Sequence, residues 1–104
     1  MKWYRNLYVS DSIGDKANRI KWKINHNAGT ISVYVIAFAS NSQNLLDIIP
    51  AQELLQKAYP KNQLYVVGLA KGYEEAIETA AKIVLEVYKN TGSFAVREYL
   101  KCKV

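Results

Sequence analysis

The sequence predicts an α/β fold, a single small domain of β-α-β-α-β-α-β order with a mostly parallel four-stranded sheet. Short runs rich in aliphatic, aromatic and β-branched residues alternate with segments whose apolar residues recur at helical spacing. Two of these runs are almost wholly apolar, as expected of central strands that are covered on both faces. A chain of 104 residues has the length of one domain, so we expect residues 1–104 to fold as one unit.

The first strand is expected at 3–9, where aromatic and β-branched residues predominate. The next segment, 13–27, has two interpretations. A helix is favoured because apolar residues recur at helical spacing, namely at Ile13, Ala17, Ile20 and Ile24. The alternative is a strand over 20–24 that turns through 26–29 into a hairpin with the strand that follows.

The two central strands are expected at 30–39 and 64–70, the most apolar runs of the chain. Between them lies Pro50, which we expect to begin a helix that ends near Tyr59. Proline is tolerated in the first turn of a helix but not in its interior. The residues just before it, 45–49, are then expected to form a short turn.

The clearest helix is expected at 73–90. Acidic residues crowd its first turn and a lysine lies in its last turn, which matches the helix dipole, and Gly92 follows as a C-terminal cap. Its inward face is expected to carry Tyr73, Ala76, Ile77, Ala80, Val84, Val87 and Tyr88. A last strand is expected at 94–100, where Arg97 and Glu98 indicate a sheet edge.

The apolar strands belong in the centre of the sheet, which gives the strand order 1-2-3-4. Right-handed crossovers in that order place all helices on one face. The other face would then expose an apolar patch larger than the few hundred Å² that a monomer tolerates. Either a second copy covers this face, which predicts a homodimer through the sheet, or a different, Rossmann-like strand order places helices on both faces.

A binding site is expected at the carboxyl ends of the parallel strands, where open α/β sheets bind their ligands. In the predicted fold these ends carry Ser10, Asp11, Ser12, Ser40, Asn41, Ser42, Lys71 and Gly72. Each group leads into a helix N-terminus, whose free N–H groups and dipole favour an anion, and Lys71 adds positive charge. Serine, aspartate and asparagine are also ordinary helix caps, which is the alternative interpretation of the same residues.

No catalytic or metal-binding constellation is recognisable, and we predict neither a metal nor a cofactor. The glycine motifs of nucleotide-binding loops are missing. His26 has no partner histidine or cysteine of the kind that zinc needs, and Cys102 is the only cysteine. A single cysteine is typical of a reducing cytoplasm. No apolar run approaches the roughly 18 residues of a membrane span, so we expect no membrane segment.

The net charge of +5 raises the question of an anionic partner. The basic segment 16–23 interleaves lysines and an arginine with Trp22, a combination that suits weak binding of single-stranded nucleic acid. No known nucleic-acid motif accompanies it, so nucleic acid is disfavoured as a partner. We expect first a non-catalytic binding or regulatory module that contacts another protein. A binder or enzyme for small phosphate-bearing ligands at the strand ends comes second.

Overall fold

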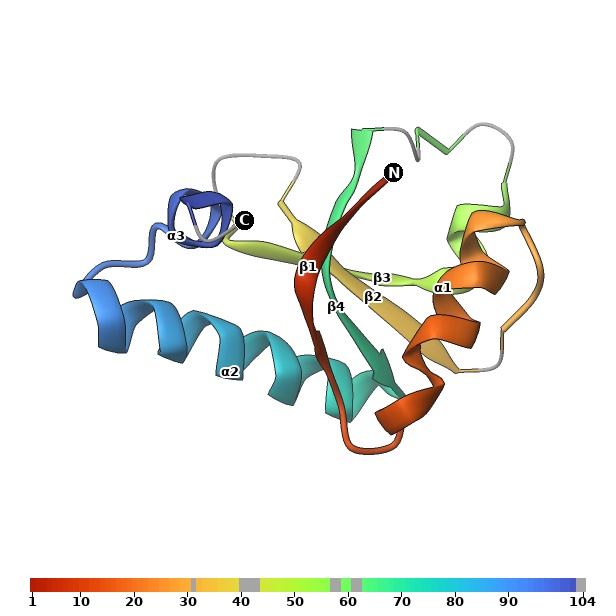
Figure 1. The fold of residues 1–104 in the computed structure, drawn as a ribbon, viewed down its shortest axis with the longest axis horizontal. Helices are drawn as coiled ribbons and strands as arrows, with labels where there is room; N and C mark the ends of the chain where they lie inside the picture. Colours follow the sequence, from red (N-terminus) through yellow and green to blue (C-terminus); the bar gives the residue numbers. More distant parts are fainter. Residues whose placement is uncertain (31, 40–43, 57–58, 61–62, 103–104) are drawn as a thin grey trace.

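The computed structural model describes residues 1–30, 32–39, 44–56, 59–60 and 63–102. The chain forms an α/β structure in which a four-stranded mixed sheet lies between helices (Figure 1). In chain order the elements are β1 (Lys2–Val9), η1 (Gly14–Lys16), α1 (Ala17–Asn25), β2 (Val33–Phe38), β3 (Leu46–Pro50), η2 (Ala51–Leu55), β4 (Tyr65–Lys71), α2 (Tyr73–Thr91) and α3 (Val96–Cys102). The two η elements are short 3-10 helices.

The strand order is β1-β4-β2-β3. The two apolar strands, β2 and β4, lie side by side in the centre as the sequence predicts. They run in opposite directions, however, because β4 pairs with β2 antiparallel and with β1 parallel. The prediction of a mostly parallel sheet is therefore wrong, and so is the prediction that all strand ends meet at one edge.

The edge strand β3 explains the mixed sheet. It occupies the stretch that we expected to be a turn, and it pairs antiparallel with β2 from Phe38 opposite Leu46 to Tyr34 opposite Pro50. Only the residues 39–45 separate the two strands, whereas a parallel connection needs a dozen or more residues. Pro50 is tolerated because it lies at the end of an edge strand. The helix expected from Pro50 is reduced to the five residues of η2.

The last expected strand, 94–100, is wrong as well, because this segment forms the helix α3. Its buried residues, Val96 and Leu100, lie four positions apart, and the partly buried Tyr99 lies three positions after the first. This is helical spacing, and a strand would bury every second residue instead.

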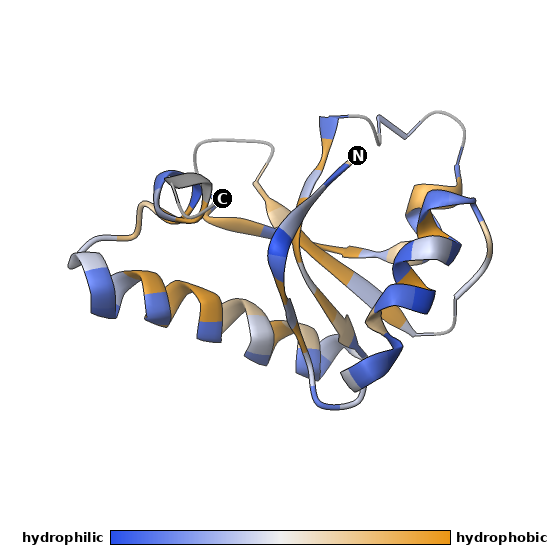
Figure 2. Ribbon diagram, in the orientation of Figure 1, coloured by the Kyte–Doolittle hydropathy of each residue, from blue (hydrophilic) through white to orange (hydrophobic). Residues whose placement is uncertain are grey.

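The segment 13–27 is helical from residue 14 to residue 25, in agreement with the favoured interpretation, and it does not form a hairpin with β2. Together with η2 it covers one face of the sheet (Figures 1 and 2). The buried core on this face consists of Ile13, Ile24, Val33, Val35, Ala37, Ile49, Ala51, Leu54, Val66 and Leu69.

The helices α2 and α3 cover the other face. The buried core there consists of Tyr4, Ile36, Phe38, Val67, Ile83 and Leu100. Helices thus pack on both faces of the sheet, so the uncovered apolar face from which we predicted a homodimer does not exist. A homodimer stays a prediction, but that surface no longer supports it.

The helix α2 is turned relative to the predicted inward face. Its buried residues are Ala76, Thr79, Ile83 and Val87, while Tyr73, Ile77 and Tyr88, which we expected inside, are 58%, 45% and 49% exposed. The apolar surface of α2 is wider than the part that the sheet covers, so one side of it remains in solvent. Among the described helices, none combines the length and the apolar character that a membrane span requires.

Candidate functional site

The carboxyl ends of β1 and β4 meet, because these two strands are parallel neighbours. The backbone N–H of Ser10 donates to the carbonyl oxygen of Leu69 at 3.0 Å, and the N–H of Lys71 donates to the Ser10 hydroxyl at 3.2 Å. The structure thus brings two of the three predicted groups together. The third group, Ser40, Asn41 and Ser42, lies outside the described residues. The strand before it, β2, runs antiparallel to β4, so the carboxyl ends of β2 and β4 lie at opposite ends of the sheet.

The serines after β1 are not helix caps. Neither η1 nor α1 has a hydrogen bond from a capping side chain. The Ser12 hydroxyl donates instead to Oε2 of Glu75 in the first turn of α2, at 2.6 Å. Gly72 makes the turn between β4 and α2 with φ of 81° and ψ of 153°, a conformation that residues other than glycine rarely adopt. These polar residues therefore join the strand ends to α2.

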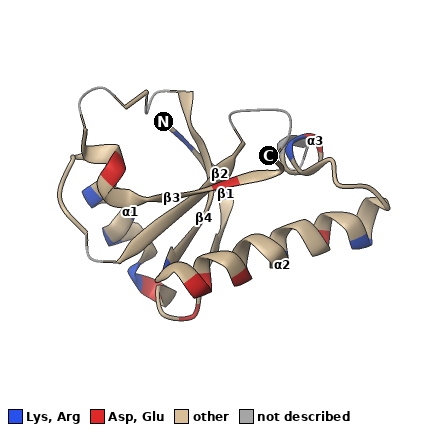
Figure 3. Ribbon diagram, turned by 180° about the vertical axis from the view of Figure 1, so that it is seen from behind, with Lys and Arg blue, Asp and Glu red and all other residues tan. Residues whose placement is uncertain are grey.

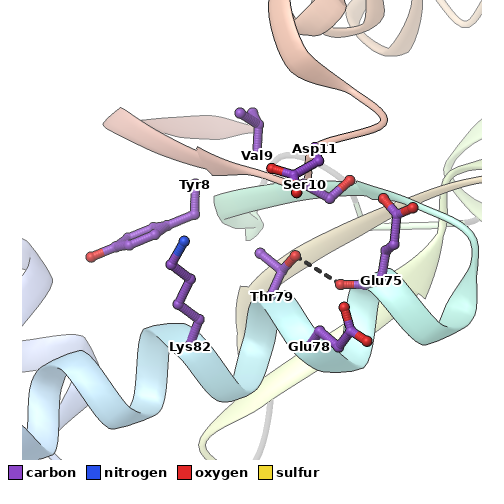
Figure 4. A pocket seen from close by; sticks show the side chains of 8 residues that line it. All are labelled: Tyr8, Val9, Ser10, Asp11, Glu75, Glu78, Thr79 and Lys82. Atoms are coloured by element: carbon purple, nitrogen blue, oxygen red, sulfur yellow. Dashed lines mark hydrogen bonds between the residues drawn. The ribbon is translucent and has the colours of Figure 1, made fainter.

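A cavity of about 210 Å³, the strand-end pocket, opens between β1 and α2 (Figure 4). It is lined by Tyr8, Val9, Ser10, Asp11, Glu75, Glu78, Thr79 and Lys82. Three carboxylates face one lysine, so the electrostatic potential of this pocket opposes an anion. The acidic residues at the start of α2 thus occupy the helix N-terminus at which we predicted anion binding.

Glu75 is held in its charged form. Hydrogen bonding from Ser10, and then from Ser12, lowers the pKa of Glu75 from its ordinary value of 4.5, and the charge of Lys71 acts in the same direction. The Thr79 hydroxyl donates to the backbone carbonyl of Glu75 at 2.7 Å (Figure 4). The carboxylate therefore links the loop after β1 to α2 as a fixed negative charge.

This geometry predicts a dependence of stability on pH. A carboxyl group with a lowered folded-state pKa stabilises the fold fully above its ordinary pKa, and this contribution is lost as the pH falls through the folded-state value. We expect the unfolding free energy of Glu75→Gln to fall less than that of the wild type between about pH 5 and about pH 2. Urea denaturation across this range tests it. Glu74→Gln, a change at an exposed neighbour, is the control, and a variant curve parallel to the wild type would contradict the prediction.

Tyr8 closes the far end of the strand-end pocket. Its hydroxyl donates to Glu86 of α2. Burial, followed by this hydrogen bond, raises the pKa of Tyr8 above its usual value of 10. The phenol is therefore neutral at pH 7 and acts as a donor that ties β1 to α2.

No cluster of three or more histidine, cysteine or acidic side chains suited to a metal ion occurs within the part of the chain that the structure describes.

A second cavity, the basic cavity, lies on the α1 side of the same strand ends and measures about 250 Å³. It is lined by Ser12, Ile13, Lys16, Arg19, Ile20, Lys23, Gly29, Thr30, Val33 and Lys71. Four of these side chains are cationic, and none of the lining residues is acidic. The contrast with the acidic first half of α2 is visible in Figure 3.

The basic cavity follows from the spacing of α1 and from the end of β4. Lys16, Arg19 and Lys23 lie three and four positions apart, so they share one side of the helix, while Ile24 is buried against the sheet. Lys71, the last residue of β4, is exposed and reaches the same cavity. The sequence indicated each of these groups separately, but it did not indicate that they face one another.

Thr30 adds a polar group at the base of the basic cavity. Its side chain is 9% exposed and is one of those that line the cavity. Trp22 stacks on His26 with ring centroids 4.2 Å apart and does not line the cavity.

No family model, curated protein or solved structure matches the chain.

Proposed function

We propose that the protein binds a phosphate-bearing ligand in the basic cavity, without catalysis. The convergence of four cations, Lys16, Arg19, Lys23 and Lys71, carries this proposal. Like charges this close together repel one another, and a phosphate group relieves that repulsion while accepting several charge-assisted hydrogen bonds. Among the described residues of the lining there is no carboxylate, histidine or cysteine that would serve as a general base or a nucleophile.

The size and polarity of the basic cavity support an anionic group rather than a whole metabolite. A volume of about 250 Å³ lies below the roughly 300–1,000 Å³ of sites that enclose a complete small molecule. The cavity accommodates a phosphate or diphosphate, with the rest of the ligand outside. The hydroxyl of Thr30, which also lines the cavity, is a further donor for a phosphate oxygen.

Calorimetric titration with inorganic pyrophosphate tests this proposal. Arg19→Gln is expected to raise the dissociation constant about tenfold, the effect of losing one charge-assisted hydrogen bond of roughly 1.5 kcal/mol. The matched control is Lys21→Gln, which removes the same charge from α1, since Lys21 lies over the Trp3 ring and does not line the cavity. Its effect is expected to be less than about twofold. Equal weakening in both variants, or no measurable heat with the wild type, would contradict the proposal.

Titrations with a mononucleotide and with a single strand of about ten nucleotides distinguish two sources of the phosphate, a small ligand and a nucleic acid. Much tighter binding of the strand, with a steep loss of affinity as salt is raised, assigns the cavity to nucleic acid. Similar affinities for the strand and the mononucleotide assign it to a small phosphate-bearing ligand. In either case Arg19→Gln must weaken binding more than Lys21→Gln does.

A further inference from the structure

Two aromatic rings are stacked on the surface at the end of α1. The indole of Trp22 packs on the ring of His26, with an angle of 21° between the ring planes. Nδ1 of His26 donates to the backbone carbonyl oxygen of Trp22 at 2.8 Å, because a carbonyl oxygen can only accept. This bond holds the two rings together. The Trp22 side chain is nevertheless 58% exposed, so much of the indole is open to contact by a further ring.

The stacked pair borders the cations of the basic cavity. Trp22 follows Arg19 by three positions, and His26 follows Lys23 by three positions. Residues three apart are neighbours on the surface of a helix, with roughly 5–6 Å between their Cβ atoms. The helix α1 contains no acidic residue, so a negatively charged group that approaches this side of it meets cations and the two rings. A flat aromatic surface and a cationic cavity therefore lie next to each other.

A nucleotide has the chemistry that matches both features. It joins a flat base to a phosphate through one sugar, so the base lies close to the phosphate but outside any pocket that encloses only the phosphate. The basic cavity, at about 250 Å³, is a pocket of that size. Every base has a π-face, so an aromatic side chain can hold a base by stacking without reading its identity. A sugar phosphate or inorganic polyphosphate would leave the two rings without a role.

We propose that the phosphate-bearing ligand is a nucleotide whose base stacks on Trp22 while its phosphate occupies the basic cavity, a proposal that rests on the function proposed above. His26 is a positioning residue, which holds the indole in place by stacking and by its hydrogen bond. A free nucleotide and a nucleotide within a single strand share this chemistry. The titrations with a mononucleotide and with a single strand distinguish these two sources.

Calorimetric titrations of the full chain with inorganic pyrophosphate and with adenosine diphosphate test the stacking, because the two probes share a diphosphate and differ in the adenosine. The wild type is expected to bind adenosine diphosphate about tenfold more tightly than pyrophosphate. Trp22→Ala is expected to weaken adenosine diphosphate about tenfold and to change pyrophosphate less than about twofold. The matched control is Trp22→Phe, which keeps an aromatic ring and is expected to lose less than about threefold. Unchanged affinity for pyrophosphate also shows that each variant is folded.

The failure of this proposal differs from the failure of the proposed function. Without pyrophosphate binding to the wild type, both fail. If pyrophosphate binds and adenosine diphosphate binds no more tightly, the base makes no contact, and only the stacking proposal is overturned. The same holds if Trp22→Ala leaves the affinity for adenosine diphosphate unchanged, or weakens both probes equally.

Tryptophan fluorescence locates the base directly. The chain has two tryptophans, Trp3 and Trp22, and the Trp3 indole N–H donates to Oδ1 of Asn25 at 3.1 Å. Adenosine diphosphate is expected to quench the emission of the wild type, and pyrophosphate is expected to leave it unchanged. In Trp22→Phe only Trp3 emits, so the quenching is expected to disappear although the nucleotide still binds. Quenching that persists in Trp22→Phe would place the base against Trp3 and overturn the proposal.

Discussion

Leu100→Ala is expected to lower the free energy of unfolding by about 2–5 kcal/mol, the range observed when a buried leucine is truncated. The Leu100 side chain is fully buried in the core between the sheet and the helices α2 and α3. Its removal costs the transfer free energy of the lost methyl groups and leaves a cavity, because the surrounding core relaxes only in part. The short helix α3 depends on this contact, since seven residues are too few for a helix to be stable in isolation.

Equilibrium unfolding in urea, followed by circular dichroism, measures this loss. Leu45→Ala is the matched control, because Leu45 is 40% exposed and the same truncation there is expected to cost about 0.5 kcal/mol or less. If Leu100→Ala proves as mild as Leu45→Ala, α3 does not pack on the sheet as described.

Gly68→Ala is expected to destabilise the fold by about 1–3 kcal/mol, and Gly68→Val by more. Gly68 lies in the central strand β4 at an irregularity in the pairing with both neighbours. A Cβ atom at this position would lie 3.2 Å from Cδ1 of Ile36 and 3.2 Å from the backbone oxygen of Tyr8. The isoleucine can adjust its rotamer, but the backbone of β1 cannot move without weakening its pairing with β4.

A double-mutant cycle separates these two contacts. Ile36→Val removes Cδ1, so it is expected to cost less in the Gly68→Ala protein than in the wild type, where about 0.5–1.5 kcal/mol is typical. Gly29→Ala is the control, since no atom of the described residues other than its own chain neighbours lies within 4 Å of a Cβ placed there, and it is expected to be neutral or slightly stabilising. Equal costs of Gly68→Ala and Gly29→Ala would show that β1 does not approach β4 closely.

The sequence predicts those helices and strands whose apolar residues recur regularly over many consecutive positions. The stripe from Ile13 to Ile24 and the helix after Gly72 are periodic enough to identify both helices, and Gly92 caps α2 as expected, with φ of 72°. The central position of β2 and β4 follows from their apolar composition, because only central strands are covered on both faces and flanked on both edges.

The direction of the strands depends on a different kind of information. Nothing within β2 or β4 encodes whether they run parallel, since that depends on the connection between them. The antiparallel strand β3 was missed because Pro50 resembles a helix start as closely as it resembles a strand end. The short connection of residues 39–45 could have indicated the antiparallel pairing, because it is too short to contain the crossover helix that a parallel pair needs.

The candidate sites show the same limit. The sequence indicates that Lys71 and the basic residues of α1 suit an anion, but only the three-dimensional structure brings them to one cavity. The orientation of α2 is equally non-local. Apolar residues extend around more than half of the helix, and the periodicity alone does not say which part of them the sheet covers. The exposed remainder includes Ile77.

The strand β4, one of the two central strands of the sheet, is the last of the four strands in the chain. During synthesis on the ribosome, β2 and β3 emerge close together and can pair at once as a local hairpin. The first strand, β1, must wait more than fifty residues for its parallel neighbour β4. Loop closure over such a distance is slow, so the nascent chain exposes the edge of β1 and the apolar side chains of β2 until β4 inserts between them. Chaperone demand and aggregation during expression are therefore expected to be greatest just before residue 71 leaves the exit tunnel.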